Sequence, residues 1–235
     1  MNMSPQHAAP SVLTIEPVAF FRSPLTSKFG IPRQSGLVEG LHGVVEFVGE
    51  YRQAEALRGL DGYDYVWLIW GFSANVSAQK HPTVRPPLLG GNERMGVWAT
   101  RSPFRPNNLG LSSVRLLRVD ADAMTILVAG ADLMDGTPIY DVKPYLPYVD
   151  SHADARAGFT EQRTWQTLQV TFSDEAAAAI SAADRDVLCR VLEQDPRPQY
   201  HADDGRCYGM PYGDYNVRFT VCGRLLCVES VEKLS

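Results

Sequence analysis

Arginine residues gather in one stretch of this 235-residue chain, between Lys80 and Arg118. The stretch holds a single acidic residue, Glu93, so its local charge is +6 (seven basic minus one acidic), although the whole chain carries −5. Its basic residues are Lys80, Arg85, Arg94, Arg101, Arg105, Arg115 and Arg118. Arginines held between prolines and glycines are suited to bidentate recognition of a phosphate or a carboxylate. An equally balanced alternative is a loop that uses glycine for positive φ angles and pairs its arginines with acids elsewhere.

Two shorter motifs also carry polar groups that suit ligand binding. Residues 133–138 (LMDGTP) contain an Asp-Gly turn, whose backbone amides and Thr137 hydroxyl can grip a polar ligand. Residues 195–200 (DPRPQY) place Arg197 between two prolines just after an expected helix, which favours a stiffly held recognition residue. An ordinary turn and a simple helix stop are the structural alternatives for these two motifs.

Signatures of several common cofactor and metal sites are absent from the sequence. There is no GxGxxG after a strand, no GxxxxGK[ST], no GxSxG and no HExxH, which argues against a Rossmann-type cofactor site, a P-loop and a zincin site. The four cysteines, Cys189, Cys207, Cys222 and Cys227, form no CxxC pair. They are best interpreted as small core residues of a protein from a reducing compartment, with a metal site or a redox pair as the alternative. We expect no metal ion.

The elements that must position these residues differ between the two parts of the chain. Up to about residue 148 the pattern is of short apolar runs separated by turn residues, with one short helix at 53–58. The expected strands are 12–20, 43–48, 66–72, 96–100, 111–119, 124–129 and 139–142. Because crossover helices are lacking, a parallel sheet is disfavoured and a closed or sandwiched β unit is favoured.

The C-terminal part mixes expected strands with an expected helix. A polar linker at 149–163 precedes a strand at 167–172, a helix that begins after Ser173 and ends before Pro196, and a hairpin of 216–221 with 225–228. Residues 1–11 resemble a disordered tail rather than a secretory signal, and the longest apolar run has seven residues (66–72). We therefore expect a cytoplasmic protein without a membrane partner. Net charge alone argues weakly against nucleic acid, but the local basic stretch argues for it.

Four segments resemble one known family closely. They are PRQ at 32–34, RPPLLGGNERMGVWATRSPFRPNNLGLS at 85–112, DLMDGTPIYDVKPYLPY at 132–148 and DPRPQY at 195–200. Together they resemble the bacterial tRNA methyltransferase O (TsaA-like) family, over nearly the whole chain from about residue 12. The length of the central segment makes the resemblance specific.

The resemblance implies a mainly β protein: a single-sheet β-barrel at 12–152 that binds S-adenosylmethionine, followed by a small α+β domain at 160–235 that engages tRNA. It also implies a homodimer with the cofactor site near the subunit interface. The implied reaction is methylation of N6 of N6-threonylcarbamoyladenosine beside the tRNA anticodon. Two alternatives stay open: a methyltransferase of the same fold for another RNA or a small molecule, and a non-catalytic module that binds the cofactor.

The family's site residues transfer to matching positions of this chain. The implied cofactor contacts are Pro32, Arg33, Gln34, Ser73, Ala74, Arg101, Leu111, Asp135, Gly136, Thr137 and Pro138. Arg33 or Arg101 suits the methionine carboxylate, and Asp135 suits the sulfonium charge. Candidates for a base that removes the N6 proton are Asp195, Asp135 and Tyr145. Expected tRNA contacts are Arg85, Arg94, Arg105, Arg197 and Tyr200.

Overall fold

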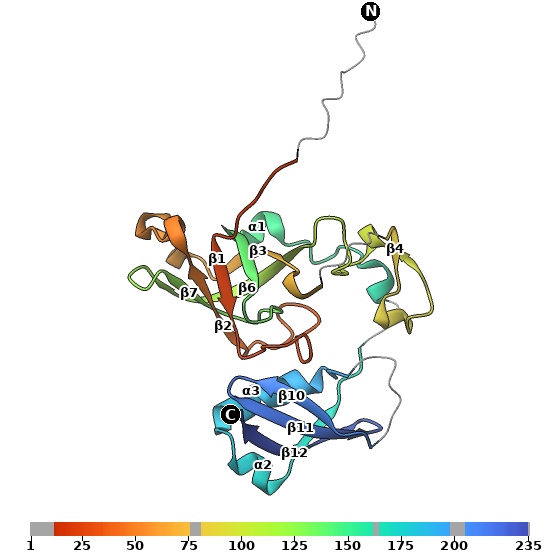
Figure 1. The fold of residues 1–235 in the computed structure, drawn as a ribbon. Coiled ribbons are helices and arrows are strands. Elements are labelled where there is room, and N and C mark those ends of the chain that lie inside the picture. Colours follow the sequence, from red (N-terminus) through yellow and green to blue (C-terminus); the bar gives the residue numbers. More distant parts are fainter. Residues whose placement is uncertain (1–11, 76–80, 162–164, 198–204, 235) are drawn as a thin grey trace, which may run out of the picture.

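The N-terminal part of the computed structural model forms a closed six-stranded barrel (Figure 1). The structure describes residues 12–75, 81–161, 165–197 and 205–234. Going around the barrel the order is β1-β2-β7-β6-β3-β8, and every neighbouring pair is antiparallel. The strands are β1 (Ala19–Arg22), β2 (His42–Phe47), β3 (Tyr65–Gly71), β6 (Leu109–Asp120), β7 (Thr125–Ala129) and β8 (Pro138–Pro144). The alternating burial along β2 and β3 explains the closure, because one side chain in two faces a shared apolar interior.

Short elements decorate the barrel. The α-helix α1 (Pro147–Asp150) follows β8, and β4 (Thr83–Val84) pairs with β5 (Met95–Gly96) in a small excursion between β3 and β6. The 3-10 helices are Gly49–Tyr51, Ala54–Leu57, Leu60–Gly62, Ser73–Asn75, Pro87–Leu89, Val97–Ala99 and Gly158–Glu161. The excursion carries much of the arginine-rich stretch, so these residues stand on a loop system rather than on barrel strands.

The C-terminal part is a four-stranded sheet with two helices. Its order is β10 (Tyr208–Tyr212), β11 (Tyr215–Cys222), β12 (Leu225–Lys233) and β9 (Gln169–Phe172), with β9 parallel to β12. The helices are α2 (Asp174–Ala178) and α3 (Ala182–Glu193). The predicted fold class, a mainly β barrel followed by a small α+β unit, is confirmed.

Three sequence-based element predictions were inaccurate. The strand expected at 12–20 begins at Ala19, because Val12 and Leu13 lie exposed with no neighbouring strand. The strand expected at 96–100 is mostly a 3-10 turn. The single helix expected after Ser173 is two helices, because Ser181 supplies a second N-cap by accepting a hydrogen bond from the backbone of Asp184.

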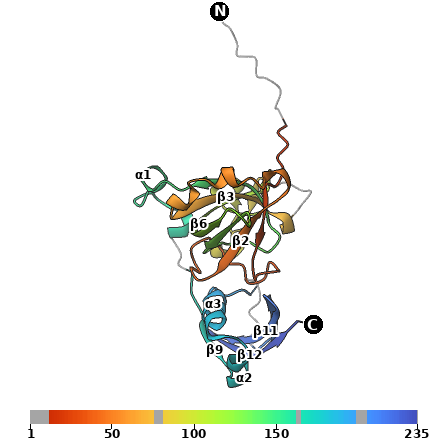
Figure 2. The same ribbon diagram turned by 90° about the vertical axis from the view of Figure 1, so that its left-hand side faces the viewer.

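The hydrophobic core is divided into two clusters, and the boundary between them does not follow the sequence. The barrel cluster is built from barrel strands and nearby loops. The second cluster combines the C-terminal elements with Leu25, Val38 and Leu41, which belong to the long β1–β2 loop and are at most 2% exposed. In Figures 1 and 2 this loop reaches from the barrel toward the C-terminal sheet.

Further contacts tie residues 23–41, which we call the bridging loop, to the C-terminal sheet. The ring of Phe29 stacks on Phe219 with centroids 6.1 Å apart. The backbone N–H of Gly213 donates to the carbonyl of Pro24 at 2.7 Å. Gly30 lies against the Met210 side chain so closely that a Cβ atom there would overlap it. The bridging loop is therefore part of the C-terminal core, although it lies in the barrel portion of the sequence.

Candidate functional site

A cavity of about 470 Å³ opens at the end of the barrel where β3 and β6 meet the bridging loop. Five chain segments form its walls: the bridging loop, the end of β3 with the residues after it, residues 100–105, the start of β6 and residues 132–137. Its lining residues include eight of the implied cofactor contacts, Pro32, Arg33, Gln34, Ser73, Ala74, Arg101, Leu111 and Thr137. Segments far apart in sequence thus meet at one place, as the motifs predicted, and the volume lies in the range of small-molecule sites.

The aromatic wall of the cavity depends on a glycine. Trp70, at the end of β3, is 7% exposed and packs edge-to-face on Phe72 with ring centroids 4.4 Å apart. Its indole lies directly over Gly110 on the neighbouring strand, where any side chain would overlap the ring. This close approach brings the indole N–H to Ser112.

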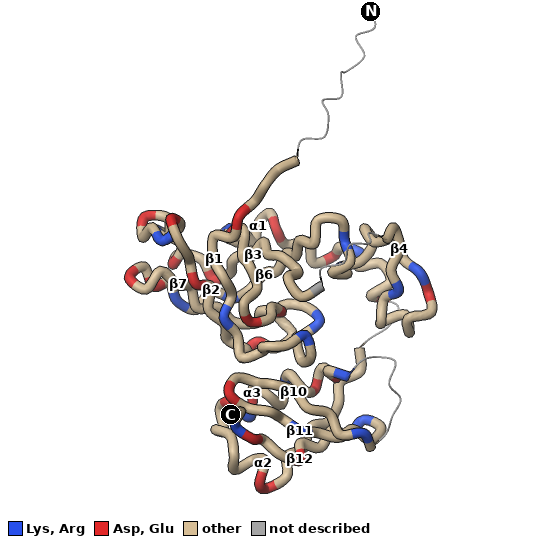
Figure 3. The backbone as a smooth tube through the Cα atoms, in the orientation of Figure 1, with Lys and Arg blue, Asp and Glu red and all other residues tan. Residues whose placement is uncertain are grey.

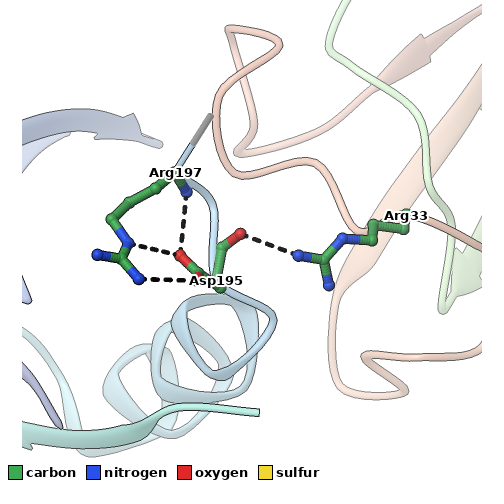
Figure 4. A network of polar contacts seen from close by, with 3 residues as sticks. All are labelled: Arg33, Asp195 and Arg197. Atoms are coloured by element: carbon green, nitrogen blue, oxygen red, sulfur yellow. Dashed lines mark hydrogen bonds and ion pairs between the residues drawn. The ribbon is translucent and has the colours of Figure 1, made fainter. Parts of the chain in front are cut away.

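Arg33 is shared between the cavity and the C-terminal part (Figure 4). Its guanidinium stacks on Trp165, 3.7 Å from the ring centroid. One of its N–H groups, on Nη2, donates to the backbone carbonyl of Asp195 at 3.2 Å. Burial lowers the pKa of Arg33, with Asp195 opposing that shift. These contacts hold the 32–34 segment in place, so Arg33 positions the loop at least as much as it faces a ligand.

The Asp195 carboxylate is occupied by Arg197, on the side away from Arg33 (Figure 4). Arg197 Nε lies 2.9 Å from Oδ1 and Nη2 lies 3.0 Å from Oδ2, and both side chains are mostly buried. Asp195 adopts a positive φ of 52°, which a non-glycine residue rarely does. Asp195 does not line the cavity. The structure therefore does not support its expected role as the base, and Arg197 has its charge already paired.

Arg101 is placed differently from Arg33. It stands exposed at the rim and donates through Nη1 to the side-chain oxygen of Gln34, whose amide in turn donates to the carbonyl of Arg33. Arg105 fixes the same loop by donating to the carbonyl of Thr100 at 2.9 Å. The cavity rim thus has a guanidinium, that of Arg101, which is oriented by a neutral amide and interacts through its charge with Asp132.

The Asp-Gly turn lies beside the cavity but points its carboxylate elsewhere. Asp135 Oδ1 accepts from the backbone N–H of Ser23 at 3.0 Å, and Gly136 takes the positive φ of 74° that the turn requires. Met134 and Thr137 line the cavity, whereas Asp135, Gly136 and Pro138 do not. The turn therefore ties the start of the bridging loop to β8. The Asp135 carboxylate faces the backbone of Ser23 and not the cavity, which differs from its expected pairing with a sulfonium.

The remaining predicted residues are spread over several surfaces. Tyr145 does not line the cavity; its ring packs on Tyr65 and on Trp67, with centroids 6.1 and 5.5 Å away. Arg85 and Arg94 lie exposed on the β4–β5 excursion, and Tyr200 lies outside the described residues. Arg115 and Arg118 lie on β6, so the arginine-rich stretch is divided between the excursion and a barrel strand; Figure 3 shows basic residues both beside β4 and on the barrel.

A partly buried carboxylate that is not among the sequence-based predictions lines the cavity. Asp132 lines it and accepts a hydrogen bond from the Ser112 hydroxyl at 2.6 Å, and Ser112 accepts one from Trp70 Nε1 at 2.9 Å. Burial raises the pKa of Asp132, against the opposing effect of the Ser112 hydrogen bond. The motif DLMDGTP contains Asp132, but only its second aspartate belongs to a recognisable Asp-Gly turn.

The fold is an antiparallel barrel and not a Rossmann fold. Its cavity is a charged site of about the size of a nucleotide. Family models narrow this class. The tRNA-methyltransferase O N-terminal domain matches residues 20–151, and the C-terminal domain of the same family matches residues 165–234. The chain belongs to the tRNA-methyltransferase O family, which confirms the resemblance seen in its motifs.

Individual relatives agree with this assignment. The chain is 38% identical to the tRNA (adenine(37)-N6)-methyltransferase of Escherichia coli, over 90% of this chain and 94% of that protein. It is 31% identical to a probable S-adenosyl-L-methionine-binding protein of Pyrococcus abyssi, over 65% of this chain and 79% of the relative. The crystal structure of the family member from Pseudomonas aeruginosa superimposes with a TM-score of 0.77 at 33% identity, covering 94% of this chain and 98% of that one.

Proposed function

We propose that this chain is an S-adenosylmethionine-dependent methyltransferase that acts on N6 of adenosine 37 in tRNA, with N6-threonylcarbamoyladenosine as its substrate nucleoside. Membership of the tRNA-methyltransferase O family and the name of the Escherichia coli relative support the reaction class. The assignment of a threonylcarbamoyl group to the substrate rests on the motif resemblance. We also propose a cytoplasmic homodimer. Among the described residues, no helix is long and apolar enough to cross a membrane.

The observation that carries the proposal is the charge arrangement of the cavity. S-adenosylmethionine combines an apolar-faced base with a carboxylate, an ammonium and a sulfonium. The cavity offers an aromatic wall in Trp70 and Phe72 for the base and an oriented guanidinium in Arg101 for the carboxylate. These groups match the ligand in kind and in sign.

The chemistry that the bound cofactor supplies is an electrophilic methyl group on sulfur. The chain's own contribution is to align the acceptor nitrogen with that methyl and to exclude water. We assign Arg101 to the methionine carboxylate, because its guanidinium is oriented at the rim by Gln34 and forms none of the salt bridges found among the described residues. Arg33 holds the 32–34 segment against the C-terminal part, and Thr137, which is 3% exposed, also lines the cavity.

Nucleoside analysis tests the proposed function directly. Purified protein is incubated with methyl-labelled S-adenosylmethionine and tRNA from a strain that lacks the native enzyme, and the nucleosides are analysed by mass spectrometry. We expect label in N6-methylated threonylcarbamoyladenosine, and none with tRNA that lacks the threonylcarbamoyl group. Label in another nucleoside would point to a different RNA substrate, and cofactor binding without product would point to a non-catalytic module.

Binding of tRNA is expected to depend steeply on salt, because exposed arginines on the β4–β5 excursion would contact phosphates. Replacing Arg85 or Arg94 with alanine should reduce the slope of log affinity against log salt by about 1 for each residue. Fluorescence anisotropy with labelled tRNA at several salt concentrations measures this slope. Arg22→Ala is the matched control, since Arg22 is an exposed arginine paired with Glu46 on β2. A slope unchanged in both excursion variants would remove the excursion from the tRNA surface.

A further inference from the structure

We propose that Asp132 is the catalytic base that takes the proton from N6 of the acceptor adenosine. The inference rests on the proposed methyltransferase function and names the residue that this function leaves unassigned. N6 of threonylcarbamoyladenosine is ureido-like and carries one hydrogen, so it is a poor nucleophile until that proton moves to a base.

The cavity has one acidic residue among its described lining residues, and that residue is Asp132. The other candidates are placed elsewhere. Asp195 has both carboxylate oxygens paired with Arg197, and the Asp135 carboxylate accepts from the backbone of Ser23. Tyr145 packs on the rings of Tyr65 and Trp67 and does not line the cavity.

Two neighbouring side chains fix the orientation of the Asp132 carboxylate. The indole N–H of Trp70 can only donate, so Ser112 Oγ accepts from it and must direct its single proton to Asp132. Ser112 is 2% exposed and Trp70 is 7% exposed, so water does not compete with this chain of hydrogen bonds. The direction of these two hydrogen bonds is therefore fixed, and the Asp132 carboxylate is held as an acceptor.

The surroundings also tune how strongly Asp132 holds a proton. Burial raises its pKa, whereas the Ser112 hydroxyl, the backbone N–H groups of Asp132 and Ser35, and the charge of Arg101 lower it. The other basic groups that line the cavity are Lys28, Arg33 and Arg105. The net effect is a raised pKa of Asp132. A base is most efficient when its pKa is close to the pH at which the enzyme works.

The proposed step is balanced in atoms and electrons. Asp132 accepts the N6 proton as N6 forms its bond to the methyl carbon. The carbon–sulfur bond breaks, and its electron pair stays on sulfur. Asp132 ends protonated, and it returns the proton to water when the products leave.

Replacing Asp132 with asparagine keeps the shape and removes the base. We expect the single-turnover rate at saturating cofactor and tRNA to fall by about 10²- to 10⁴-fold. Cofactor affinity, measured by calorimetry, should stay within about threefold of wild type. Asp141→Asn is the matched control, because Asp141 lies on β8 outside the cavity and faces Lys143. Retention of more than a tenth of the wild-type rate, or a loss explained by weaker cofactor binding, would overturn the proposal.

A second test compares an NMR titration, which needs neither turnover nor cofactor, with the pH–rate profile. Carbon-13 NMR titration of the Asp132 carboxyl in the free protein should give a higher pKa in Ser112→Ala than in wild type, because a donor to the ionised form has been removed. The acid limb of the pH–rate profile should move upward with it. An acid limb that does not follow the titration would reject Asp132 as the base. If wild type itself makes no product, the proposed function fails instead, so the two failures are distinguishable.

Discussion

The Arg101→Ala variant is expected to bind S-adenosylmethionine roughly 10- to 100-fold more weakly than wild type, because a charge-assisted hydrogen bond to the methionine carboxylate is lost. Arg101 is oriented at the cavity rim by the Gln34 side chain. Lysine at the same position should recover only part of the affinity, since an ammonium cannot grip a carboxylate with two parallel N–H groups. Calorimetric titration of cofactor into each variant measures both effects.

Two controls sharpen this result. Arg58→Ala removes an exposed arginine that pairs with Glu55, away from the cavity, and should leave cofactor affinity unchanged. 5′-Methylthioadenosine lacks the methionine carboxylate, so its affinity should not respond to Arg101→Ala. An equal loss for both ligands would show that Arg101 shapes the cavity and does not contact the carboxylate.

The second large effect is expected from Leu25→Ala in the bridging loop. Leu25 is fully buried among residues of the C-terminal core, so the free energy of unfolding should fall by about 2–5 kcal/mol. Cofactor affinity should fall too, because the 32–34 segment follows Leu25 in the same loop and depends on the same packing.

Comparison with two other leucines tests where Leu25 belongs. Leu226 is fully buried in the C-terminal core, and Leu68 is fully buried in the barrel core. Thermal unfolding followed by calorimetry should show that Leu25→Ala lowers the same transition as Leu226→Ala. If Leu25→Ala instead shifts the transition that Leu68→Ala shifts, the bridging loop is energetically part of the barrel.

Local patterns were sufficient to predict most of the architecture. Short apolar runs at 43–48 and 66–72, separated by turn residues, predicted the barrel strands, because strand composition and turn chemistry act over a few residues. The bridging loop could not be predicted in this way. Leu25, Val38 and Leu41 are scattered among polar residues, and their common burial depends on β10 and β11, which lie more than 150 positions further along the chain.

The candidate site shows the same division. Eight of the eleven implied cofactor residues line one cavity. The sequence does not show which of the two aspartates in DLMDGTP points into that cavity. Asp132 precedes the turn and accepts a hydrogen bond from Ser112 on β6, whereas Asp135 accepts one from the backbone of Ser23. Side-chain direction was decided by long-range partners that no local pattern encodes.

Because the bridging loop packs on C-terminal residues, the proposed cofactor cavity is completed late in the synthesis of each polypeptide. The ribosome delivers residues 23–41 early, whereas Trp165 follows residue 41 by 124 positions (165 − 41) and β10 to β12 later still. At about 5–20 residues per second, the loop waits roughly 6–25 s for its first partner from the C-terminal part. The barrel strands have all been synthesised by then. We therefore expect a chain that terminates early to lack the packing that holds the 32–34 segment and to bind the cofactor more weakly.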